Sequence, residues 1–121
     1  MNNLNLTVFY KLLQATKDEI LEDLLNRLEN TEQDIYLLHL EMLVDEGYIK
    51  GASVSSSGSA LLYGITYPRL TQRGYQLCDG LKDLSVVKTI TEKAKKLDKT
   101  LTLSFAEAVI STLTVELLKC E

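Results

Sequence analysis

The stretch HLEMLVDEGYI, residues His39–Ile49, decides the fold because it reads as the end of a helix followed at once by a strand. No helix breaker interrupts Ile35–Glu46, and Gly47 supplies a helix-ending residue that tolerates a positive φ angle. Beyond it, Tyr48–Val54 and Ala60–Tyr67 are β-compatible runs separated by the flexible segment SSSGS. We therefore expect a helix that leads directly into a β-hairpin.

A second informative stretch, YPRLTQRGYQL, follows the hairpin and covers Tyr67–Leu77. Pro68, the single proline of the chain, suits the exit from an edge strand, where the missing N–H costs no ladder hydrogen bond. Thr71 is a good N-cap for a further helix, whose end we place at Gly80. The hairpin is therefore expected to lie between two helices.

Upstream of these stretches, the apolar spacing predicts two more helices. The first covers residues 4–15, and the second starts with a capping box formed by Thr16 and Glu19. Asn30 is expected to close the second helix, and Thr31 to begin the helix that leads to the hairpin.

Two helices are also expected after the hairpin region. One covers residues 85–97, and the other starts at a capping box of Ser104 and Glu107. The stretch 101–118 has few charges but many hydroxyl side chains, and a carboxylate near mid-bilayer costs roughly 2.5 to 3.5 kcal/mol. We expect it to be a buried helix and not a membrane span.

The order helix, helix, helix, hairpin, helix is that of a winged helix, a helix-turn-helix variant. The predicted fold is mainly α with a small β-hairpin and additional C-terminal helices. We expect a single domain over residues 1–121, with a winged-helix unit at about 4–82 and a helical extension at about 83–121.

The residues around the hairpin give the chain a resemblance to a known group, the small phage and prophage winged-helix proteins of the YjcQ-like kind. The resemblance covers about Ile35–Leu97. The matching residues before and after the wing are His39, Leu40, Leu43, Gly47, Ile49, Leu70, Thr71, Gly74 and Leu77. The resemblance implies a winged-helix fold and a mobile-element origin, but no biochemical activity, because the function of the group is largely unassigned.

Composition places the chain among ordinary globular proteins, with 45% hydrophobic and 25% charged residues in 121. The two cysteines, Cys78 and Cys120, are too few for a disulfide framework, and the first residues lack a secretory signal. We therefore expect a cytoplasmic protein. Residues 1–60 hold four Lys/Arg against ten Asp/Glu, whereas residues 61–121 hold nine against seven. The acidic half contains the predicted recognition helix, which disfavours duplex DNA as a ligand.

The sequence offers no set of catalytic or metal-ligating residues. His39 is the single histidine, and its apolar neighbours indicate a partly buried side chain bonded to the backbone. We expect Cys78 to act as a small core residue, and Cys120 to have no role beyond oxidation in vitro. No enzyme activity, cofactor, metal or small-molecule site is predicted.

The outward side of the helix before the hairpin is the main functional candidate. It is expected to include Gln33, Asp34, Leu37, Leu38 and Glu41. Leucines rimmed by acids are typical of a protein-binding surface. The leading hypothesis is therefore an accessory protein that binds a partner protein through Leu37, Leu38 and Glu41.

The alternative hypothesis is a DNA-binding transcriptional regulator. It rests on analogy with the usual use of the winged-helix fold. In it, the helix at 32–46 and the wing at 50–66 contact DNA. The residues that would do so are Gln33, Lys50, Arg69 and Arg73.

The last helix is apolar around most of its circumference, so it must be buried in its own domain or against another chain. We expect a homodimer through this helix. The predicted interface residues are Phe105, Val109, Ile110, Leu113 and Leu117.

Overall fold

A computed structural model describes residues 5–58, 60–96 and 102–119, with the side chains at 57, 84 and 114–119 outside the description. Over these ranges the chain forms six helices and one two-stranded antiparallel sheet. The elements in chain order are α1 (Leu6–Lys17), α2 (Leu21–Arg27), α3 (Asn30–Asp45), β1 (Ile49–Ser57), β2 (Ala60–Leu70), α4 (Gln72–Leu81), α5 (Leu84–Lys96) and α6 (Leu103–Lys119). The predicted mainly helical class with one hairpin is confirmed.

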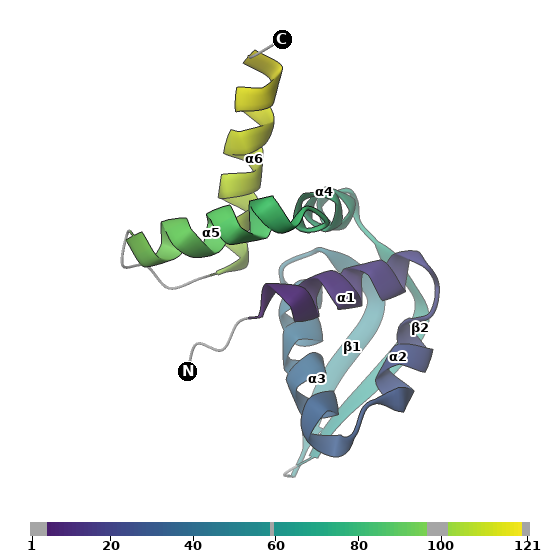
Figure 1. Cartoon of the computed structure of the whole chain (residues 1–121). Helices are drawn as coiled ribbons and strands as arrows, with labels where there is room; N and C mark the ends of the chain where they lie inside the picture. The colour runs from purple at the N-terminus through teal and green to yellow at the C-terminus, as the bar shows by residue number, and fades with distance from the viewer. Residues whose placement is uncertain (1–4, 59, 97–101, 120–121) are drawn as a thin grey trace.

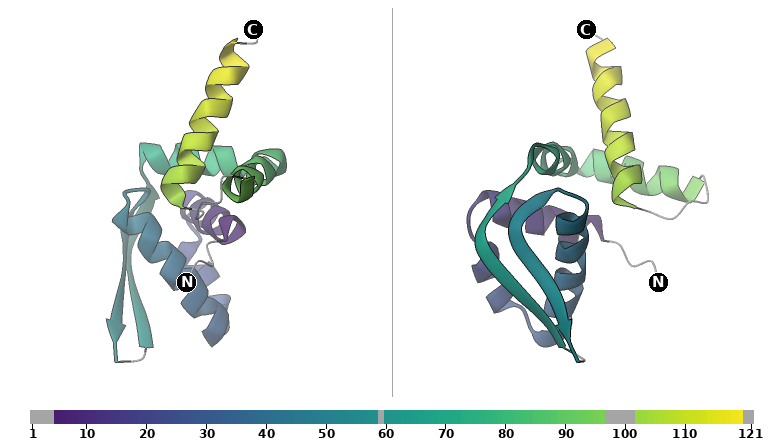
Figure 2. Two further views of the ribbon diagram at one scale, coloured as in Figure 1. Left: turned by 90° about the vertical axis from the view of Figure 1, so that its left-hand side faces the viewer. Right: turned by 180° about the vertical axis from the view of Figure 1, so that it is seen from behind.

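The hairpin is covered on one side only. Helices α1, α2 and α3 lie together against one face of β1 and β2, and Figure 1 shows them in front of the hairpin. Seen from behind, the other face of the hairpin has none of the described helices over it (Figure 2). Helix α4 crosses the end of this unit next to α1, and α5 and α6 lie beyond it, with α6 pointing away from the rest (Figures 1 and 2).

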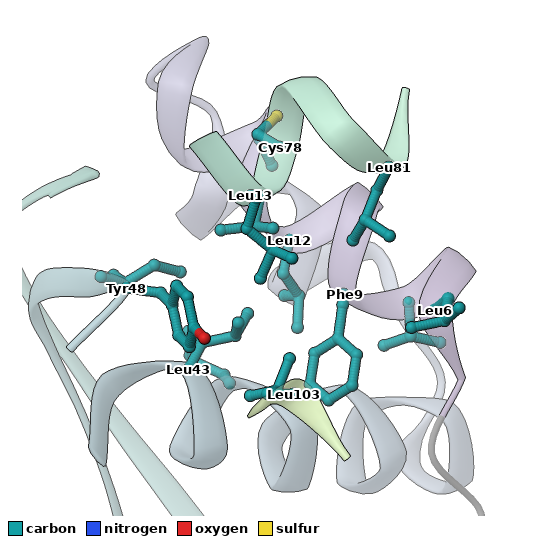
Figure 3. Close-up of a cluster of buried hydrophobic side chains, with 14 of the residues drawn as sticks. Leu6, Phe9, Leu12, Leu13, Leu43, Tyr48, Cys78, Leu81 and Leu103 are labelled. Atoms are coloured by element: carbon teal, nitrogen blue, oxygen red, sulfur yellow. The ribbon is translucent and has the colours of Figure 1, made fainter. Parts of the chain in front are cut away.

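The core fills the space between α1, α3 and α4. The side chains of Phe9, Leu12, Leu40, Leu43 and Tyr48 are fully buried there, and Figure 3 shows several of them converging with Leu103 of α6. Since each fully buried large apolar side chain contributes about 1.5 to 3 kcal/mol, this cluster is the main source of stability. The start of α6 is therefore part of the same core as the N-terminal helices.

The turn after α3 has the geometry that Gly47 was expected to allow. Gly47 has φ +84°, its N–H donates to the Val44 carbonyl over 3.1 Å, and the Tyr48 N–H donates to the Leu43 carbonyl over 2.8 Å. These two bonds form a Schellman motif, which satisfies helix carbonyls that would otherwise lack partners. The chain therefore leaves α3 abruptly and enters β1 with Tyr48 already buried.

Helix α4 begins at the predicted cap. The Thr71 hydroxyl accepts a bond from the Gly74 N–H over 3.2 Å and donates to the Gly47 carbonyl over 2.6 Å. The Thr71 N–H also donates to the Tyr48 carbonyl over 3.0 Å. One side chain thus caps α4 and ties it to the end of α3.

The hairpin is longer than the sequence suggested. Pairing continues from Ile49↔Leu70 out to Ser57↔Ala60, so the serines assigned to the tip are mostly in β1. Pro68 lies inside β2 and not at its exit, because a bulge sets Gly51 opposite residues 66–68 and relieves the proline of a ladder bond.

Several predicted helix boundaries were wrong. Thr16 lies within α1, where its hydroxyl donates to the Leu12 carbonyl over 2.7 Å, so it does not cap α2. A threonine can make this bond without leaving the helix, and its burial favours doing so. Asn30 begins α3 instead of closing α2, which ends at Arg27.

The later boundaries also differ in part. Gly80 lies inside α4, where a Cβ would overlap the side chain of Ile110 in α6, so its small size serves packing. Helix α6 is capped by Thr102, whose hydroxyl accepts from the Phe105 N–H over 3.0 Å, and not by Ser104. Glu107 is unavailable for a capping box because its carboxylate binds Arg73.

The turn at Gly47 yields a stability prediction. Gly47→Val should destabilise the protein by about 2 kcal/mol or more, because a β-branched residue tolerates positive φ badly. In a domain of this size that loss lowers Tm by roughly 8 °C. Gly58→Ala should be milder, because alanine has no branch at Cβ and a Cβ at Gly58 meets nothing within 4 Å. An unchanged Tm for Gly47→Val in a thermal melt would contradict the described end of α3.

Candidate functional site

Helix α3 turns a different side to the core from the one expected. Leu37, Leu40 and Leu43 are all 0% exposed, so the prediction that Leu37 faces outward was wrong. Each residue turns an α-helix by about 100°, so residues three apart lie on the same side. Leu37 therefore lies on the side of Leu40, which faces the core. Leu38 is 39% exposed and Glu41 is half-buried, in agreement with their predicted placement.

The outer side of α3 combines apolar and acidic residues. Ile35 and Leu38 are among the most exposed large hydrophobic side chains in the described part of the chain, at 44% and 39%. Asp34, Glu41 and Asp45 lie along the same side of the helix. Helix α3 contains four carboxylates and no lysine or arginine. We call Asp34, Ile35, Leu38, Glu41 and Asp45 the α3 face.

Gln33 was the one conventional base-reading side chain expected on this helix. Its amide Nε2 instead donates to the Leu25 carbonyl over 2.9 Å, and the side chain is half-buried. The bond satisfies the end of α2, so Gln33 has a structural task within the chain.

His39 confirms the structural interpretation made from its neighbours. It is 4% exposed, its Nδ1 bonds the Ile35 carbonyl over 2.7 Å, and its Nε2 accepts from the Asn5 N–H over 3.0 Å. The Phe9 ring lies 4.7 Å from the imidazole between centroids. Both ring nitrogens are thus occupied by backbone groups, and the histidine ties the start of α1 to α3.

Arg73, predicted as a possible DNA contact, is engaged by α6 and by the turn between α3 and β1. Its guanidinium bonds both oxygens of Glu107 in α6 at 3.1 Å and the Glu46 carbonyl at 2.6 Å. It also lies over the Tyr48 ring, 4.5 Å from the centroid, and donates to the Tyr48 hydroxyl. We call Tyr48, Arg73 and Glu107 the arginine clamp, because it joins α4, α6 and the turn that follows α3.

The clamp shifts the pKa values of its members, among them Tyr48 and Glu107. Burial of the phenol, together with the nearby Glu107 carboxylate, raises the pKa of Tyr48 to about 12. Hydrogen bonds from Arg73 lower the pKa of Glu107 below its ordinary value. At neutral pH the phenol is therefore neutral and the carboxylate charged. In these states Tyr48 can accept a hydrogen bond from Arg73, and Glu107 can form its ion pair with Arg73.

Lys50 and Arg69, the other predicted DNA contacts, lie close together at the base of the hairpin. They are directly paired across the two strands, and both are exposed. Tyr67 lies beside them, 74% exposed, with the Arg69 guanidinium 5.6 Å from the centroid of its ring. Sequence reasoning missed Tyr67, because nothing in its neighbours indicated a bulge at this point.

The predicted dimer residues are divided between core and surface. Val109 is 6% exposed and belongs to the chain's own core, while Phe105, Ile110 and Leu113 are half-buried against it. Leu117 lies outside the described side chains. Val109 therefore offers no surface to a second chain, and self-association through α6 stays a prediction.

The thiol of Cys78 is buried as predicted, and burial raises its pKa. Cys120 lies outside the described residues. Within the ranges that the structure covers, there is no group of three or more His, Cys, Asp or Glu side chains arranged to hold a metal ion. None of the helices described combines the length and apolar character needed to cross a membrane.

Comparisons of the chain with protein-family models, with curated proteins and with solved structures found no match.

The arginine clamp yields a pH prediction. Because its pKa is lowered in the folded state, Glu107 stabilises the fold above its ordinary pKa near 4.5, and this contribution is lost as pH falls through the lowered value. In thermal melts, Glu107→Gln should lower Tm at pH 7, and the gap to the wild type should close towards pH 3. The exposed Glu92→Gln in α5 serves as the control and should follow the wild type. A constant gap at every pH would show that the charge of Glu107 is not what holds α6.

Proposed function

We propose that this chain is a non-enzymatic accessory protein of a phage or prophage, of winged-helix type, that acts in the cytoplasm by binding another protein through the α3 face. The observation that carries the proposal is the composition of that face. Ile35 and Leu38 are exposed in a helix that has four carboxylates and no cation. An apolar centre with a charged rim is the usual composition of a protein-binding patch.

The arrangement of elements supports the winged-helix part of the proposal. Helices α1, α2 and α3 are followed directly by the hairpin, and α3 lies next to β1. In that fold the third helix is the recognition element. A helix in this position with an apolar and acidic surface is better suited to binding a protein than to binding a DNA duplex.

The chemistry of the α3 face also limits the partner. Burial of Ile35 and Leu38 is favourable when they pack against apolar side chains of the partner. The surrounding carboxylates of Asp34, Glu41 and Asp45 favour lysine or arginine at the edge of the partner surface. The expected partner surface is therefore an amphipathic segment with a basic rim, such as a helix laid along α3.

The alternative, a regulator that reads duplex DNA with α3, has less support from the geometry. Gln33 is bonded to α2, and Arg73 is held by Glu107. Carboxylates on the recognition helix repel the phosphates that supply most of the affinity in such complexes. Lys50 and Arg69 remain, and they lie on the hairpin and not on α3.

A photo-cross-linking amino acid at position 38, in the cells that naturally make the protein, tests the proposal. We expect one predominant adduct with another protein, and Ile35→Glu should reduce its yield about tenfold, since losing one central apolar contact costs about 1.4 kcal/mol or more. The same probe at Leu62, 52% exposed on the hairpin, is the matched control and should not give this adduct. Identical adducts from positions 38 and 62, or none from 38, would contradict the proposal.

A further inference from the structure

The uncovered face of the hairpin differs chemically from the rest of the chain. Residues 49–70 contain no carboxylate, and their two charged residues are Lys50 and Arg69, in a chain of net charge −4. In and beyond the bulge, the exposed positions of the two strands carry mostly small or hydroxyl residues, among them Ser53, Ser55, Gly64 and Thr66, and one large apolar residue, Leu62. The face is thus cationic at its base and neutral along its length.

The cations at the base are placed in an unfavourable position for an isolated protein. Lys50 and Arg69 stand directly opposite each other, and like charges at paired positions of two antiparallel strands destabilise the pair. Neither has an ion pair with a carboxylate in the described part of the chain. An anion between them would turn this repulsion into attraction.

Tyr67 adds an aromatic surface at the same place. It has φ +53°, a strained value for an aromatic residue, and its side chain is 74% exposed. The bulge holds it there, because Gly51 lies so close to the Tyr67 carbonyl that a Cβ at position 51 would overlap it. With the Arg69 guanidinium 5.6 Å from its centroid, the ring is set beside this cation and away from the core.

We propose that the outer face of the hairpin binds single-stranded nucleic acid, with a phosphate between Lys50 and Arg69 and an unpaired base stacked on Tyr67. An exposed ring beside cations is the arrangement by which proteins hold single strands without reading their sequence. A strand can also continue along the hairpin, where Ser53, Ser55 and Thr66 offer hydroxyl donors and no carboxylate repels it.

The exposed ring favours a single strand over a duplex. Bases in a duplex are already stacked on their neighbours, so a tyrosine at the surface gains little from them, whereas an unpaired base gains a stacking partner. This surface is separate from the α3 face, so the inference stands whether or not α3 binds a protein.

The test is fluorescence anisotropy of the full chain with a labelled oligo(dT) of about 20 nucleotides. One neutralised phosphate predicts that log K falls with log salt with a slope near −0.7, at roughly 0.7 per phosphate. Lys50→Gln with Arg69→Gln should flatten this slope, and Tyr67→Asn, which tolerates positive φ, should weaken binding about tenfold with the slope unchanged. Lys88→Gln with Lys95→Gln, which removes the same charge from exposed positions of α5, should leave binding unchanged.

Four results would overturn the inference. They are the absence of binding at ~20 mM salt, an equal loss in the α5 control, tighter binding of a duplex of the same length, and full competition by thymidine monophosphate at equal phosphate concentration. The last result would assign the site to free nucleotides and not to a strand.

Discussion

The carbonyl and ring of Tyr48 hold the end of α3, the start of the hairpin and α4 in one arrangement. Gly47 turns the chain so that Tyr48 is buried, and the Tyr48 carbonyl then accepts the Thr71 N–H that begins α4. Arg73, two residues further on, lies over the Tyr48 ring and carries the connection to Glu107 of α6. Because these contacts join four elements, loss of the turn would disturb the hairpin and the C-terminal helices together.

This constraint also fixes the two surfaces to which functions are assigned. With the end of α3 held, Leu37, Leu40 and Leu43 must point inward, and the acidic positions with Leu38 must point outward. The hairpin leaves the same turn with its inner side on the helices, so Lys50 and Arg69 face outward. The chain thus presents an acidic apolar helix and a cationic aromatic hairpin as separate surfaces.

Local signals in the sequence were sufficient where a residue has one favourable role. Gly47 and Thr71 were assigned correctly because a glycine after a helix and a threonine before one have few competing uses. Thr16 and Ser104 failed because a hydroxyl residue can cap a helix or lie within it, and tertiary packing decides between the two. Glu107 was assigned to a local cap, whereas its partner Arg73 is 34 residues away and gives no local signal.

The facing of α3 could not be derived from the sequence for a similar reason. Apolar residues surround much of this helix, so the apolar pattern alone does not select one side for the core. They are Ile35, Leu37, Leu38, Leu40 and Leu43. The selection depends on the contacts of α3 with α1 and β1. Tyr67 was missed because its exposure follows from a bulge, and a bulge depends on the pairing of two strands.

Thiol reactivity at two adjacent positions tests this account most directly. In a Cys120→Ser background, where the remaining Cys78 is buried, Leu38→Cys should react with Ellman's reagent at once in the folded protein. Leu37→Cys should react more than about tenfold slower, since its labelling requires local opening of the core. Equal rates at the two positions would contradict the described orientation of α3, and with it the assignment of the α3 face as a binding surface.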